Sequence, residues 1–167
     1  ALLRSRAVAG GADLRNRYES LRVELLRAAV RRQTLREDVR SMRERMRSEL
    51  SKSKAGEFDL KQDAGGITDV EFLAQYWALL WSARYAELVT YSDNIRQLES
   101  LASICLVPQE TVDVLTAAYR AYRQRLHHLS LEGGENVAPA VGFESTRAAV
   151  TEIWRQAMET SLQSTSD

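Results

Sequence analysis

The residues best suited to chemistry lie in one short stretch, residues 61–71, which read KQDAGGITDVE in one-letter code. The two adjacent glycines allow a tight turn or a close approach of another group to the backbone. The apolar run that follows predicts a helix, and the free amides and dipole at a helix N-terminus favour an anion. The stretch therefore predicts a site for a phosphate-like anion, with Lys61 adding positive charge.

The carboxylates of the same stretch could face a metal ion or a proton, but each also has a structural interpretation. Glu71 lies three residues after Thr68, the spacing of a capping box. Asp69 falls in the first helical turn, where the dipole favours a carboxylate whatever its function. Asp63 has no evident local structural role, so the functional hypothesis is stronger for it than for the other two.

The remaining members of the stretch have similar alternatives. Gly65 and Gly66 either cradle a phosphate or only form a tight turn into a packed helix. Lys61 either faces solvent or reaches toward a phosphate group as a mobile point charge. The candidate set is Lys61, Asp63, Gly65, Gly66, Asp69 and Glu71.

Almost all of the remaining chain has helical periodicity. We expect an all-α bundle of about six helices, with at most a short extended segment near residues 57–61. The helix after residue 68 is apolar on most sides and should lie in the middle of the bundle. Ser92 or Asp93 should cap a fourth helix, and Pro108 suits the first turn of a fifth.

Two earlier helices show one apolar face each. The first face comprises Leu14, Tyr18, Leu21 and Leu25; the second comprises Leu35, Val39, Met42, Met46 and Leu50. A capping box at residues 34–37 (TLRE) should begin the second of these helices. The methionines there are expected in the core, and Arg36, Arg40, Arg43 and Arg47 crowd the other face.

Charge is distributed unevenly along a chain whose formal net charge is zero. Residues 1–54 hold 15 Lys/Arg and 7 Asp/Glu, whereas the other 113 residues hold 8 and 16. Because no aromatic residues are interleaved with the arginines, we expect pairing inside the domain or with a protein rather than with nucleic acid.

Cysteine and histidine usage excludes several classes of site. The single cysteine, Cys105, rules out an internal disulfide framework, fits a reducing cytoplasm and is expected to be buried on an apolar stripe. The only histidines, His127 and His128, are adjacent, so they point about 100° apart on a helix and cannot share a metal ion. We expect one of them to be partly buried and the other exposed, with no zinc site. No apolar run is long enough to span a bilayer.

Residues 61–72, KQDAGGITDVEF, resemble the signature of the helical domain of bacterial glutamine synthetase adenylyltransferases. Four other segments support this resemblance: residues 7–10 (AVAG), 39–46 (VRSMRERM), 92–96 (SDNIR) and 126–129 (LHHL). The resemblance covers essentially the whole chain. The related uridylyltransferases of the PII signal protein share a Gly-Gly-Leu-Arg-Asp version of the motif, and the pair Glu71-Phe72 fits the adenylyltransferases better.

The resemblance implies a single helical domain over residues 1–167, the C-terminal fragment of a larger enzyme. Members of the family carry a nucleotidyltransferase core with a Gly-Ser turn and an Asp-x-Asp pair that binds magnesium, and this chain contains neither. The core is therefore expected to precede residue 1, and the fragment alone is expected to have no catalytic residues, no metal ligands and no activity.

The full-length enzyme would transfer AMP from ATP, with Mg²⁺, to a tyrosine of glutamine synthetase, in the cytoplasm. The resemblance implies the PII protein as a partner and glutamine as an effector, with no nucleic acid or membrane. The helical domain would close or support the nucleotide cleft through residues 61–71. Two alternatives stay open: an interaction module whose basic helices at 13–50 dock an acidic protein, or the helical domain of a PII uridylyltransferase.

Overall fold

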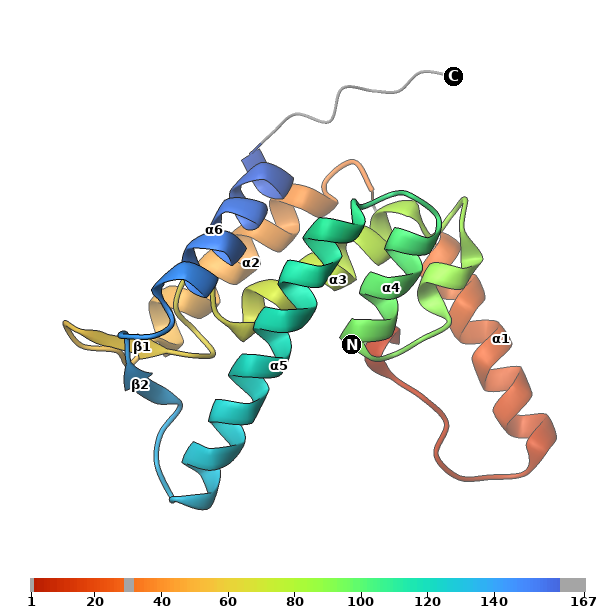
Figure 1. Ribbon diagram of the computed structural model, residues 1–167. Coiled ribbons are helices and arrows are strands. Elements are labelled where there is room, and N and C mark those ends of the chain that lie inside the picture. Colours follow the sequence, from red (N-terminus) through yellow and green to blue (C-terminus); the bar gives the residue numbers. More distant parts are fainter. Residues whose placement is uncertain (1, 29–31, 160–167) are drawn as a thin grey trace.

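The computed structural model describes residues 2–28 and 32–159. This part of the chain forms six α-helices, two 3₁₀ turns and one two-stranded sheet (Figure 1). The elements are η1 (Leu2–Arg4), α1 (Ala12–Ala28), α2 (Leu35–Leu50), β1 (Glu57–Asp59), α3 (Ile67–Trp81), η2 (Ala86–Val89), α4 (Asn94–Ser103), α5 (Gln109–Leu131), β2 (Val137–Pro139) and α6 (Glu144–Glu159). The predicted all-α bundle with a short extended segment is confirmed.

Helix α3 lies at the centre of the bundle, as its apolar sequence predicts. It contacts α2, α4, α5, α6 and η2. Val70, Leu73, Ala74 and Ala78 have no solvent exposure, because neighbouring helices cover several sides of α3. In Figure 1, α5 crosses in front of α3 while α2 and α6 run side by side. The residues just before α3 are therefore enclosed by other elements.

Arginines from the basic part of the chain bind the C-terminal end of α3. Arg32 Nε donates to the Leu80 carbonyl at 3.2 Å, and Arg27 donates to the carbonyls of Ser82 and Ala83 at 3.1 and 2.9 Å. These carbonyls lie at the negative end of the helix dipole, where a cation is favourable. Arg27 and Arg32 therefore bind backbone carbonyls inside the domain.

The two-stranded sheet connects the segment before α3 to the segment before α6. Strands β1 and β2 pair antiparallel, with Phe58 opposite Ala138. The Leu60 amide extends the contact by donating to the Asn136 carbonyl at 2.9 Å. Phe58 is fully buried. This short sheet fixes the start of the turn that leads into α3.

The predicted apolar faces of the first two helices are only partly buried. On α1, Leu14, Leu21 and Leu25 are 65%, 54% and 43% exposed, because α1 packs mainly against η1 and η2 with its other side. On α2, Met42 is exposed while Arg43 is completely buried. The predicted pairing of basic residues inside the domain is confirmed for Arg43, because the Asp69 carboxylate on α3 pairs with it.

Both predicted capping boxes are wrong, although the helices form. Thr34 precedes α2, but its hydroxyl donates to the Asp38 carboxylate and caps no backbone amide. Helix α3 begins earlier than expected, with Gly66 as its N-cap, so Thr68 lies inside the helix. The cap predicted for the fourth helix is confirmed, since the Asp93 carboxylate accepts from the Arg96 amide at 3.0 Å.

Two predictions about single side chains also fail. Cys105 is exposed, because α4 ends at Ser103 and Cys105 occupies a turn with a φ of 57°. His127 and His128 are both exposed on α5, so neither is the partly buried histidine that was expected. Among the described residues, no helix is both long and apolar enough to cross a membrane.

Candidate functional site

The Gly-Gly stretch folds into a tight turn between β1 and α3. The Gly66 amide donates to the Asp63 carbonyl at 3.0 Å, and the Ile67 amide donates to the Leu60 carbonyl at 2.8 Å. The Gly65 amide donates to the Asp69 carboxylate at 2.7 Å. The amides of Gly65, Gly66 and Ile67 thus already have acceptors within the protein, so they do not form an open cradle for a phosphate.

Glycine is required at Gly65 for two reasons. Its φ of 76° lies in the left-handed region, and a Cβ atom there would approach the Arg147 carbonyl oxygen to 2.3 Å and the Thr151 hydroxyl to 2.6 Å. At Gly66 a Cβ would come within 2.8 Å of the Leu60 carbonyl. The glycines therefore allow α6 and the backbone of Leu60 to pack directly on the turn.

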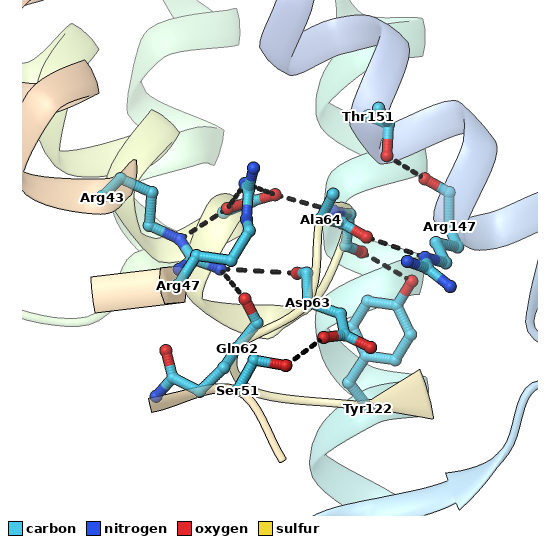
Figure 2. A network of polar contacts seen from close by, with 11 residues as sticks. Arg43, Arg47, Ser51, Gln62, Asp63, Ala64, Tyr122, Arg147 and Thr151 are labelled. Carbon is cyan, nitrogen blue, oxygen red and sulfur yellow. Dashed lines mark hydrogen bonds and ion pairs between the residues drawn. The ribbon is translucent and has the colours of Figure 1, made fainter. Parts of the chain in front are cut away.

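Asp69 anchors the turn to α2. Its Oδ1 atom accepts from Arg43 Nε at 2.6 Å, and its Oδ2 atom accepts from the Gly65 amide. The side chains of Asp69 and Arg43 are 1% and 0% exposed. Arg47 lies farther from the same carboxylate, at 3.5 Å. Arg43 also donates to the Gln62 carbonyl at 2.8 Å, so one guanidinium joins α2, the turn and α3 (Figure 2).

Asp63 is held within the loop that precedes the glycines. Its carboxylate accepts from the Ser51 hydroxyl at 2.7 Å, the Ser53 hydroxyl at 3.0 Å and the Asp59 amide at 2.9 Å. Burial by itself would raise the pKa of Asp63, but these hydrogen bonds and the charge of Arg147 outweigh it and lower the pKa below its ordinary value. Asp63 thus has the structural role that its sequence context did not reveal.

Helices α5 and α6 close the other side of the turn. Arg147 Nε donates to the Ala64 carbonyl at 2.9 Å, and the Tyr122 hydroxyl donates to the Gly65 carbonyl at 2.9 Å. Figure 2 shows these two side chains reaching the turn from the side opposite Arg43. Burial raises the pKa of Tyr122 well above its ordinary range, so the phenol stays protonated and remains a donor.

The two outer members of the candidate set differ in accessibility. The Lys61 side chain is exposed to solvent. Its backbone is fixed, because the Lys61 amide donates to the Asp59 carboxylate at 2.9 Å. Glu71 is 26% exposed and forms an ion pair with Arg4 at 3.2 Å. Its Oε1 atom also accepts from Asn94 Nδ2 at 3.2 Å, so it points toward α4 instead of capping α3.

A cavity of about 510 Å³ lies over the turn, between α2 and α6. Ala64 and Asp69 contribute to its lining, together with Arg47 and Trp154. The Asp69 carboxylate in this lining is already bonded to Arg43 and to the Gly65 amide, and no group of three His, Cys, Asp or Glu side chains in residues 2–28 and 32–159 could hold a metal ion. These residues do not fit a magnesium site.

A family profile described as GlnD PII-uridylyltransferase matches residues 28–165. The chain belongs to this GlnD-type family. Three curated relatives are named bifunctional glutamine synthetase adenylyltransferase/adenylyl-removing enzyme. They are 40%, 41% and 38% identical over 159 residues and come from Thioalkalivibrio sulfidiphilus, Nitrosococcus oceani and Pasteurella multocida. Each alignment covers 95% of this chain but only 16% of the relative.

The structure brings together most of the predicted candidates in this GlnD-type domain, but it adds partners that sequence reasoning missed. Gly65, Gly66 and Asp69 meet in one network, and Asp63 is next to it. The sequence placed Arg43 among the arginines opposite the apolar face of its helix but did not name its partner, because periodicity on α2 gives no indication of a carboxylate 26 residues later. The spacing within one helix carries no information about such a tertiary partner.

Proposed function

We propose that this chain is the helical domain beside the nucleotidyltransferase core of an enzyme that transfers AMP from ATP to a tyrosine of glutamine synthetase. The observation that carries the proposal is the match of 95% of the chain to relatives named as glutamine synthetase adenylyltransferases, at about 40% identity. Because the chain spans 16% of those relatives, the activity belongs to the longer protein, and we expect the fragment alone to be inactive.

Within this proposal the Gly-Gly turn is a rigid support that faces the nucleotide cleft. Its amides and its buried carboxylates are committed to internal bonds, which supports a positioning role rather than direct phosphate binding. Lys61 is the exposed charged member of the candidate set. We assign to it the contact with the triphosphate, since a lysine on a fixed backbone serves as a point charge.

ATP and Mg²⁺ belong to the full-length enzyme in this proposal, with their ligands mainly outside residues 1–167. Magnesium would stabilise charge at the phosphate during nucleotidyl transfer. This chain would hold the Lys61 ammonium group at the edge of that site. The PII protein and glutamine remain the regulatory partners implied by the family resemblance.

The test is steady-state adenylylation of glutamine synthetase by the full-length enzyme carrying Lys61→Ala. We expect turnover to fall by about tenfold, the effect of losing one charge-assisted contact. The unfolding midpoint should not change, because the Lys61 side chain is exposed. Lys54→Ala, another exposed lysine on the loop before β1, is the matched control. Equal turnover in both variants would refute the contact.

A second candidate, a protein-interaction module, is favoured by the exposed leucines of α1. Leu14, Leu21 and Leu25 lie on one helical face and leave it apolar and open. If this face binds glutamine synthetase, Leu21→Glu should abolish capture of glutamine synthetase by the 167-residue chain. Retained capture would reject this use of the face.

A further inference from the structure

A second cavity lies on a part of the domain that the proposed function does not use. Its volume is about 560 Å³, and it forms where the segment after η1, helix α1 and the loop between η2 and α4 meet. None of its lining residues belongs to the cavity over the Gly-Gly turn. The polar residues that matter here are Arg6, Glu19, Arg22, Ser92, Asp93 and Arg96.

Arg22 forms the inner wall of this cavity and is 3% exposed. Its Nε atom donates to Glu19 at 2.7 Å and its Nη2 atom donates to the Thr90 carbonyl at 3.0 Å. The third nitrogen, Nη1, is shielded from solvent and has no hydrogen-bond partner. A buried guanidinium N–H without an acceptor is costly, so a ligand oxygen that reached it would be strongly favoured.

The charges that line the cavity do not balance. Three guanidinium groups face two carboxylates. Glu19 pairs with Arg22, and Asp93 pairs with Arg96 at 3.8 Å while capping α4. The charge of Arg6, at the exposed rim, is therefore unmatched within the lining. Arg96 is also placed over the Tyr91 ring at 5.0 Å, which holds its guanidinium near the opening.

We propose that this cavity binds a single oxyanion, the phosphate or carboxylate group of a small ligand, through Arg6, Arg22 and Arg96. Planar guanidinium groups match both oxyanions because they donate two parallel N–H bonds to paired oxygens. The Ser92 hydroxyl lies in the same lining and adds a neutral donor. The proposed site also assigns a binding role to residues 92–96, a segment that takes no part in the Gly-Gly turn.

The experiment is an NMR titration of the 167-residue chain with inorganic phosphate and, separately, with acetate. Chloride keeps the ionic strength constant, so that the screening of charges is the same at every point of the titration. We expect saturable shifts of the Arg22 Nε–H signal and of the Ser92 amide at millimolar ligand. Saturation with phosphate identifies a phosphate group as the ligand, and saturation with acetate alone identifies a carboxylate.

Arg6→Gln should weaken the binding by about tenfold, because it removes one charge-assisted contact. It should leave the unfolding midpoint unchanged, since Arg6 is exposed. Arg120→Gln removes the same charge from the exposed surface of α5 and serves as the control. Shifts that never saturate with either anion, or equal weakening by both substitutions, would overturn the proposal.

Discussion

Replacing Asp69 with asparagine tests whether the buried ion pair holds the Gly-Gly turn on α2. Oδ1 of Asp69 faces the Arg43 Nε–H and Oδ2 faces the Gly65 amide. An asparagine turns one of these acceptors into a donor, so in either orientation of the amide one donor faces another. The substitution also leaves the charge of Arg43, which is 0% exposed, without a counter-ion.

We expect Asp69→Asn to lower the free energy of unfolding by about 3–5 kcal/mol, the usual effect of removing one partner of a buried pair. Domains of this size are stable by about 5–15 kcal/mol, so the loss is a large fraction of the total. Urea unfolding followed by circular dichroism measures it as a shift of the midpoint at constant slope.

Glu37→Gln is the matched control for this experiment. It neutralises one partner of the Arg40–Glu37 pair, whose side chains are 48% and 67% exposed. Such a surface pair contributes below about 1 kcal/mol. If Asp69→Asn costs no more than Glu37→Gln, the buried pair does not hold the turn, and the structural account of Asp69 is refuted.

Two further predictions concern the same turn. Gly65→Ala should destabilise the fold by at least about 2 kcal/mol more than Gly133→Ala in thermal unfolding. Both glycines have positive φ, but only at Gly65 would a Cβ atom meet Arg147. Equal destabilisation by the two substitutions would contradict the close approach of α6 to Gly65. The lowered pKa of Asp63 stabilises the fold at neutral pH, and this contribution should be lost as the pH falls through 3.8 toward the lowered value. The stabilities of the original chain and of Asp63→Asn should therefore converge as the pH falls below 3.8, and a difference between the two urea midpoints that stays constant with pH would contradict this.

Local sequence patterns were sufficient to predict the fold class and the central helix. Periodicity reports which side chains share a face, and an apolar run such as residues 70–80 can be buried only inside a bundle. The short strand at 57–59, the cap at Asp93 and the Gly-Gly turn were also predictable, because each depends on neighbours within a few residues.

Which charged and apolar groups are buried depends on how the helices pack, and local patterns did not predict it. Arg43 is enclosed while Leu21 and Met42 are exposed, the reverse of what helical periodicity suggests. The reason is that burial depends on the surface that packs opposite each helix: Asp69 provides a counter-charge for Arg43, whereas no described element covers the outer face of α1.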